Sequence, residues 1–109
     1  MNNTVLTTLL AGAGLLLSQA ALATDEAAQT LAKDSGCLSC HAIDQKVVGP
    51  SYQSIAQKYA GQADALADLM ASVQNGSKGK WGRIPMPAHR ELSARDLEKL
   101  VKWVLSQKG

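Results

Sequence analysis

Hydrophobic side chains recur at helical spacing in four stretches of the chain, and no stretch alternates apolar and polar residues as a strand does. The most regular stretch covers residues 63–74, where the positions i, i+3, i+4 and i+7 are Leu66, Leu69, Met70 and Val73. The dipeptide Asn75-Gly76 follows and is a typical helix stop. The pattern predicts an all-α fold.

The last stretch has the clearest beginning. Ser93 can cap a helix, and Asp96 lies three residues later, at the spacing of a capping box. Leu92 and Leu97 occupy the two positions of a hydrophobic staple. The helix is predicted to run to about Gln107, with Trp103 at the margin of its buried face. That face consists of Leu97, Leu100, Val101, Val104 and Leu105.

The two remaining stretches are shorter. One covers residues 25–33, and Gly36 is its predicted stop. Its apolar stripe is Ala28, Leu31 and Ala32. The other begins after Gly49-Pro50, uses Ser51 as its cap and ends at Gly61. Its buried face is predicted to be Ile55, Ala56 and Tyr59.

The N-terminal part differs from the rest of the chain. Residues 5–22 carry no charge, and the small residues of Ala21-Leu22-Ala23 precede the first acidic residue, Asp25. This order is typical of a secretory signal peptide and its cleavage site. The apolar run is too short and too interrupted to predict a membrane span. We therefore expect a cleaved signal peptide at residues 1–23, a domain at residues 24–109 and a periplasmic location. An uncleaved N-terminal anchor is the alternative.

Charge and size narrow the class of protein. All 11 basic and 9 acidic residues follow residue 23, so the predicted mature domain keeps the net charge of +2. A strongly electrostatic nucleic-acid binder would carry a dense basic face, and this class is excluded. A domain of this size buries only about 60–65% of its unfolded surface, so it usually recruits a disulfide, a metal or a cofactor.

The two cysteines belong to the run Cys37-Leu38-Ser39-Cys40-His41, a C-x-x-C-H motif. On a helical turn, positions i and i+3 lie about 5–6 Å apart on one face. Two thiols placed in this way can add to the two vinyl groups at one edge of a porphyrin. The next residue, His41, can then supply an axial nitrogen to the iron. The motif is the sequence signal for covalent attachment of haem c.

Two alternatives use the same residues without haem. An exported dithiol or disulfide needs only Cys37 and Cys40, whereas a thioredoxin-like redox pair needs a βαβ context that this sequence lacks. A zinc ion could take Cys37, Cys40, His41 and His89, although adjacent residues rarely reach one tetrahedral ion together. The alternative function is therefore an exported dithiol or metal-binding module.

A second axial ligand is expected from residues 75–92, which lack helical periodicity. A loop of this length is uncommon in a small domain unless it has a function. Met86 lies there between two prolines, whose fixed φ angles stiffen the backbone around a thioether that can ligate iron. Met70 belongs to a helical stripe and is interpreted as a core residue. His89 is interpreted as an exposed histidine or as a hydrogen-bond donor near Met86.

Further residues are candidates for contacts around the haem. The carbonyl of Pro50 can accept the Nδ1–H of His41 and fix its tautomer. The indole N–H of Trp81 can reach a propionate, and Arg83 can neutralise one. An apolar contact patch for redox partners is expected at Val47, Val48, Ile84 and Pro85. Its predicted rim is Lys33, Lys46, Lys58, Lys78 and Lys80.

Together, these motifs resemble class I cytochromes c, and among them the small bacterial cytochrome c-551 (c8) group of pseudomonads. The matching pieces cover essentially the whole predicted mature chain: residues 36–44, Val48-Gly49-Pro50, Asn75-Gly76-Ser77, Trp81-Gly82, Ile84-Pro85-Met86-Pro87 and residues 103–108. The resemblance implies a small single-domain fold of about four helices around one covalently attached haem.

The resemblance also implies a function and a ligand set. The chain would be a soluble, monomeric one-electron carrier and not an enzyme, with no nucleic-acid partner and no stable membrane insertion. Cys37 and Cys40 would form the thioether bonds, and His41 and Met86 would be the axial ligands. In this family, the residue matching Pro50 accepts a hydrogen bond from the axial histidine, and the residue matching Trp81 binds a propionate. Typical partners are a nitrite reductase, a terminal oxidase or a quinol–cytochrome c reductase, docked transiently.

Two positions depart from the pattern of the group. His89 stands where close relatives often carry asparagine near the methionine sulfur, and it adds a titratable group at that place. Arg83 stands where relatives often carry proline, and it adds a charge close to the haem. The first is expected to affect the pH dependence of the reduction potential, and the second the docking of partners.

Overall fold

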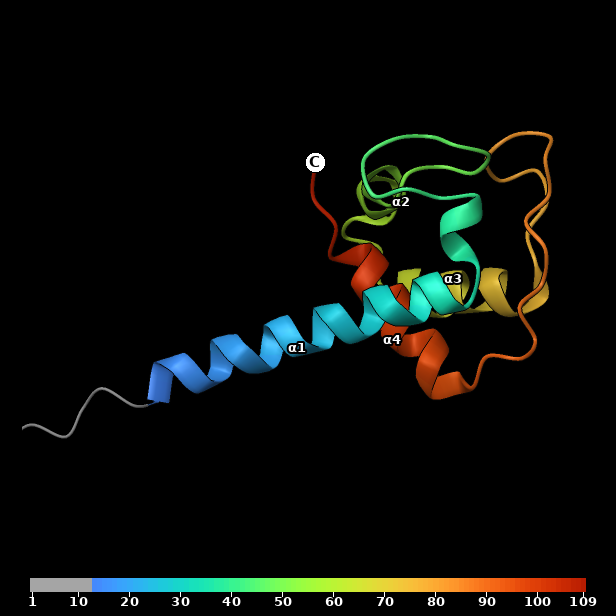
Figure 1. Ribbon diagram of the computed structural model, residues 1–109. Coiled ribbons are helices and arrows are strands. Elements are labelled where there is room, and N and C mark those ends of the chain that lie inside the picture. Colours follow the sequence, from blue (N-terminus) through green and yellow to red (C-terminus); the bar gives the residue numbers. More distant parts are fainter. Residues whose placement is uncertain (1–12) are drawn as a thin grey trace, which may run out of the picture.

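The structure is a computed structural model that describes residues 13–109, with side chains described from residue 24 (Figure 1). The elements in this range are α1 (Ala13–Asp34), the 3-10 helix η1 (Cys37–Ser39), α2 (Tyr52–Tyr59), α3 (Ala65–Asn75) and α4 (Ala94–Leu105). In place of strands, the same range has isolated bridges that pair His41 with Lys46 and Ser77 with Met86. The all-α prediction is confirmed, and the four predicted helices are all present.

The helix α1 is longer than predicted. It begins at Ala13 instead of residue 25, and it therefore passes through the predicted cleavage site. The added residues are rich in Ala and Leu and contain no proline, so the uncleaved sequence has the propensity to continue the helix. Residues 1–12 of the predicted signal peptide lie outside the described residues. Among the helices in residues 13–109, none is long and apolar enough to cross a membrane.

The helix α4 is the centre of the fold, because it contacts α1, α2 and α3 (Figure 1). Leu97, Leu100 and Val101 are buried, as predicted. Trp103, predicted at the margin of this face, is instead buried, and its ring meets the Tyr52 ring edge-on at 5.3 Å between centroids. The indole extends far enough to fill the space between α4 and α2. The hydrophobic pattern of α4 alone does not reveal this burial.

The other helices bury small or aromatic side chains against α4. Ala28 and Ala32 of α1 are each 1% exposed, so their helix can approach closely. The face of α2 is buried, as predicted for Ile55, Ala56 and Tyr59. The stripe of α3 differs from the prediction, because Leu69 is its one buried member. Its other members, Leu66, Met70 and Val73, are partly buried at the edge of the core.

The N-terminal cap of α4 offers a test of the local structure. The Ser93 hydroxyl accepts a hydrogen bond from the Asp96 backbone N–H at 3.1 Å, as the sequence predicts. We expect Ser93→Ala to lower the free energy of unfolding by about 1 kcal/mol, because this N–H loses its acceptor. Denaturant unfolding measures the change, and Ser93→Asp, which keeps a capping oxygen, is the matched control. Equal unfolding midpoints for the two variants would contradict the expectation.

Candidate functional site

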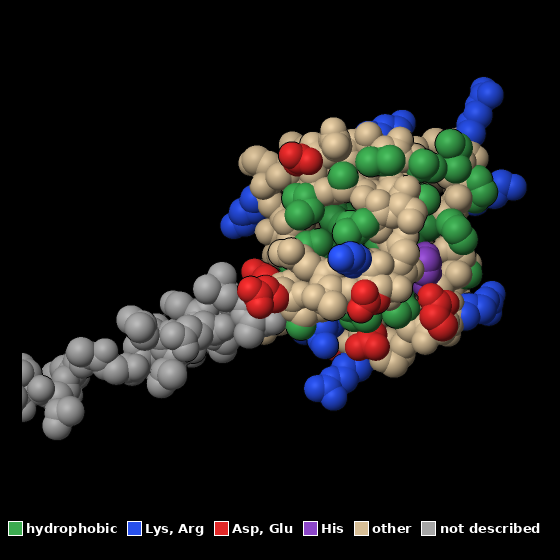
Figure 2. Space-filling model, viewed as in Figure 1, with side chains coloured by type: hydrophobic (Ala, Val, Ile, Leu, Met, Phe, Trp, Pro, Cys, Tyr) green, Lys and Arg blue, Asp and Glu red, His purple; other side chains and the backbone are tan. Residues whose placement is uncertain are grey.

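A cavity of about 380 Å³ lies between η1, the three shorter helices and the loop that connects α3 to α4. Its volume falls within the roughly 300–1,000 Å³ of small-molecule and cofactor sites. Apolar side chains from α2, α3 and α4 form much of its wall: Ile55, Leu69, Val73, Leu100, Val101 and Val104. The cavity accounts for the partial exposure of Val73 and Val104, since part of each faces this space and not another helix. In Figure 2, apolar side chains gather over the upper part of one face, while most acidic groups in view lie in the lower part.

The turn that carries Cys37, Cys40 and His41 begins at Gly36, whose φ of 78° is readily adopted only by glycine. The backbone N–H groups of Cys40 and His41 both donate to the Cys37 carbonyl, at 3.2 and 3.0 Å. This tight turn brings the side chains of Cys37 and Cys40 to the same cavity. Both cysteines are partly buried, and neither forms a disulfide. Burial raises the pKa of the Cys37 thiol above its usual value.

His41 is held on several sides. Its Nδ1 lies 2.7 Å from the carbonyl oxygen of Pro50, and because a carbonyl can only accept, Nδ1 carries the proton. The other ring nitrogen, Nε2, is therefore the one with a free lone pair for a metal. The Tyr52 ring stacks on the imidazole at 5.4 Å between centroids.

Gly49 completes the surroundings of this ring. Its N–H donates to the Cys40 carbonyl at 2.8 Å, which folds the chain back over the turn that carries the two cysteines. A Cβ atom at Gly49 would lie 2.6 Å from Cε1 of His41. The position therefore tolerates only glycine while the ring keeps its place.

Met86 reaches the cavity from the loop. Its backbone pairs with Ser77 through two hydrogen bonds of 2.8 and 3.1 Å, which fix the loop where it passes the end of α3. Gly76 precedes this pair with a φ of 82°, and a Cβ there would lie 2.8 Å from the Met86 carbonyl oxygen. Met86 is partly buried and lines the cavity. Met70 packs against the core instead, as predicted.

His89 does not line the cavity. Its backbone N–H donates to the Val73 carbonyl at 2.9 Å, and its Nδ1 lies 3.3 Å from Oε1 of Glu91. The pKa of Glu91 is lowered, first by a hydrogen bond from its own backbone N–H and then by His89. The second histidine of the chain is thus engaged with a carboxylate at the end of the loop.

The remaining predicted residues also reach the cavity wall: Pro50, Trp81 and Arg83. Trp81 is 38% exposed, and the ammonium of Lys58 lies 4.4 Å from the centroid of its ring. Sequence reasoning missed the contacts of Gly49 and Tyr52 with the imidazole. A glycine between a valine and a proline outside any helix was a signal for close packing, whereas the stacking of Tyr52 depends on the fold of two separate segments.

The chain is similar to several known proteins. A cytochrome c family model matches residues 26–108. Cytochrome c-551 of Pseudomonas aeruginosa is 52% identical over 95 residues, which cover 87% of this chain and 88% of that protein. Cytochrome c-551 of Azotobacter vinelandii is 45% identical over 83 residues, 76% of this chain and 100% of that protein. The crystal structure of wild-type Nitrosomonas europaea cytochrome c552 is similar, with a TM-score of 0.71 at 42% identity, covering 73% of this chain and 99% of that one.

Proposed function

Because the chain belongs to the cytochrome c family, whose members are electron carriers with covalently attached haem c and not enzymes, we propose that it is a periplasmic one-electron carrier with His41 and Met86 as axial ligands. One observation carries the ligand assignment. The two thiols, the imidazole of His41 and the thioether of Met86 line the same cavity.

The residues of the cavity fit haem c chemically. Cys37 and Cys40 present two free thiols from one turn, as two thioether bonds require. His41 is held in the tautomer that leaves Nε2 free to ligate iron. Met86 adds a thioether, and a histidine–methionine pair is a ligand set of c-type cytochromes. The apolar wall suits the faces of a porphyrin.

When bound, haem c supplies an iron that accepts and releases one electron, and the chain's own residues control this couple. The Pro50 carbonyl holds the Nδ1 proton of His41, which keeps the imidazole oriented and basic. The Met86 thioether raises the reduction potential relative to a second imidazole. Leu69, Val73 and Val101 exclude water from the cavity, and this lower polarity disfavours the more charged oxidised state.

The apolar patch predicted for partner docking is exposed. Val47 is 51%, Val48 44% and Ile84 69% exposed, and Pro85 is exposed beside them. Lys46 and Arg83 line the cavity near this patch. We propose that redox partners of the nitrite reductase, terminal oxidase or quinol–cytochrome c reductase type contact it transiently, with the lysines steering the encounter.

The proposed location rests on the N-terminal sequence. The family match begins at residue 26, just after the predicted cleavage site that follows Ala23. We propose that residues 1–23 are removed on export and that the mature protein begins at Thr24. The mass of the protein in a periplasmic extract tests this boundary, and a mass equal to that of the full chain would contradict it.

The alternative function is an exported dithiol or metal-binding module. A redox-active cysteine needs a lowered pKa, whereas burial raises that of Cys37. Within the described residues, no group of three or more His, Cys, Asp and Glu side chains is arranged to hold a metal ion. Both observations favour the cytochrome function over this alternative.

A visible absorption spectrum of the exported protein tests the proposal. We expect sharp low-spin c-type bands on reduction and the weak far-red band of thioether-ligated ferric haem. A colourless protein, produced with its haem-attachment machinery present, would overturn the proposal in favour of the dithiol or metal module. Haem bands without the far-red feature would move the sixth ligand from Met86 to His89 or to an open site.

A glycine substitution tests the support of His41. In Gly49→Ala, the new methyl group meets the imidazole, so we expect a weakened far-red band and a loss of about 1–3 kcal/mol of stability. Gly61→Ala is the control, since Gly61 has a φ of 75° with no neighbour near its would-be Cβ. It should cost about 1 kcal/mol from backbone strain while the spectrum stays unchanged. Indistinguishable spectra for both variants would contradict the proposed packing.

A further inference from the structure

Lys80 occupies an unusual place on the wall of the cavity. It belongs to the loop between α3 and α4, next to Trp81, and it lines the cavity. Its Nζ lies 3.1 Å from Oδ1 of Asp68 and 2.8 Å from the hydroxyl of Ser72, so its side chain reaches across to α3. Ser72 lines the cavity as well, whereas Asp68 does not. The ammonium therefore sits where the loop and α3 meet at the cavity wall.

Haem c carries negative charges that a nearby ammonium group can stabilise. It carries two propionate carboxylates, and a carboxylate at a largely apolar wall is costly unless a cation or hydrogen-bond donors face it. The cationic side chains that line the cavity are Lys46, Lys80 and Arg83. Among these three described side chains, only Lys80 has its charged group held by hydrogen bonds.

We propose that Lys80 is a cationic partner of a haem propionate, and that Asp68 and Ser72 are positioning residues that hold its ammonium at the cavity wall. This inference rests on the proposed binding of haem in the cavity. It assigns to Lys80 a role at the cofactor, distinct from the steering of redox partners expected for the other lysines.

Contacts from α2 hold the same stretch of loop. Lys58 donates to the Lys80 carbonyl at 3.5 Å while its ammonium lies over the Trp81 ring. The ammonium of Lys80 is the main cause that lowers the pKa of Asp68, and Tyr59 lowers it further. Asp68 therefore stays ionised and keeps its hold on Lys80. The indole N–H of Trp81, next in sequence, can provide a second donor to the propionate.

The charged and titratable groups around this place come from several elements. The segment before α2 contributes Lys46, and α2 contributes Lys58 and Tyr59. Asp64 precedes α3 as its N-cap and α3 itself contributes Asp68, while the loop contributes Lys78, Lys80 and Arg83. The part of α4 that lines the cavity is apolar. Cations exceed anions in this set, so it favours an ionised propionate.

The proposal is tested by the pH dependence of the reduction potential of the holoprotein. Reduction adds an electron to the haem, so a nearby propionate binds its proton more tightly in the reduced state. The potential then falls as pH rises between the propionate pKa values of the oxidised and reduced states. We expect Lys80→Gln to lower the potential at neutral pH and to move this window upward by about one pH unit, because an opposite charge is lost beside a carboxylate.

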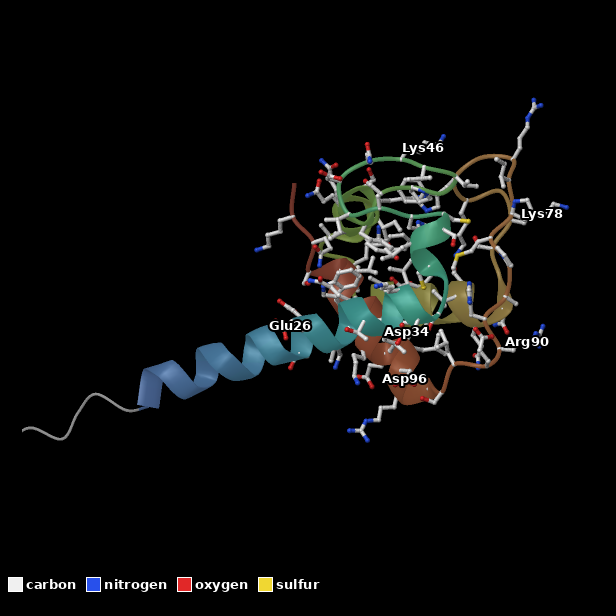
Figure 3. All side chains as sticks on the ribbon, in the orientation of Figure 1. Glu26, Asp34, Lys46, Lys78, Arg90 and Asp96 are labelled. Atoms are coloured by element: carbon white, nitrogen blue, oxygen red, sulfur yellow. The ribbon has the colours of Figure 1, made fainter. Side chains whose placement is uncertain are left out.

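Lys78→Gln is the matched control. Lys78 is an exposed neighbour in the same loop that does not line the cavity, and it projects outward from the protein (Figure 3). The Lys78→Gln substitution changes the net charge by the same amount as Lys80→Gln. We expect it to leave the pH range over which the potential falls unchanged. Lys80→Arg keeps the charge and should restore most of the behaviour of the unaltered chain. Asp68→Asn removes one partner that positions the ammonium but keeps the charge itself, so it should move the window upward by less than Lys80→Gln does.

The outcomes separate this inference from the proposed function. If Lys80 only ties the loop to α3, Lys80→Gln and Asp68→Asn will lower the melting temperature alike, and Lys80→Gln will move the window no more than Lys78→Gln. That result would overturn the role of Lys80 while normal haem spectra left the cytochrome function intact. Loss of the haem spectrum from the unaltered chain would instead overturn the proposed function.

Discussion

Replacing Met86 with alanine is expected to abolish the far-red band of the ferric protein and to lower its reduction potential by on the order of 0.1 V or more, since axial ligands set haem potentials over about 0.8 V. Met86 lines the cavity and brings the thioether that we propose as the sixth ligand. Alanine leaves the iron without that sulfur, so the oxidised state loses a ligand that disfavours it. Absorption spectroscopy and a potentiometric titration measure the two effects.

The variant should also open a coordination position. Small ligands such as carbon monoxide or imidazole are expected to bind Met86→Ala and not the unaltered protein. Met70→Leu is the matched control, because Met70 packs against the core. A volume-conserving replacement there should cost less than about 1.5 kcal/mol and leave the spectrum unchanged. An intact far-red band in Met86→Ala would refute ligation by this residue.

Local signals explain why the helices were predictable. The caps of α2 and α4 depend on Ser51 and Ser93, each of which accepts a hydrogen bond from an N–H three residues later. The burial of Trp103 and the early start of α1 were not predicted. The burial depends on what lies opposite Trp103 in α2, and the start of α1 reflects the continuation of a helix through an apolar segment that was interpreted as a signal peptide.

The site also has one part that the sequence predicts and another part that only the fold reveals. Cys37, Cys40 and His41 lie within one short run of the chain, residues 37–41, so their spacing is enough to indicate covalent haem attachment. The cluster of Lys80 with Asp68 and Ser72 joins the loop to α3, and none of the three residues stands at a motif position. A charge in a glycine-rich loop is usually solvated, and the sequence alone gave no reason to treat Lys80 differently from Lys78.

The cavity lies where the hydrophobic core of the fold would contact the cofactor. Apolar side chains of α3 and α4 face it, and they lack protein partners on that side. Without a group in this space, these apolar side chains face water, and a domain of this size has little other apolar surface to bury in their place. The cofactor is therefore expected to be part of the core that α4 organises.

The double substitution Cys37→Ala, Cys40→Ala is accordingly expected to prevent stable folding. It removes both thioether bonds, so haem that enters the cavity can be extracted and the space beside Leu69 and Val101 is left unfilled. We expect no haem stain after denaturing electrophoresis, and a circular dichroism spectrum with most of its helical signal lost. Ser39→Ala, in the same turn, is the control, and it should retain both the stain and the helical spectrum.

The single variants separate attachment from folding. Cys37→Ala and Cys40→Ala each keep one sulfur atom, so one thioether bond can still hold the haem and preserve the core. We expect these proteins to fold with lowered melting temperatures. A haem-free double variant that melted cooperatively with native helical content would contradict the role of the cofactor in the core. It would mean that α1, α2 and α3 pack on α4 well enough to tolerate the cavity, and that haem adds function to a domain that already folds without it.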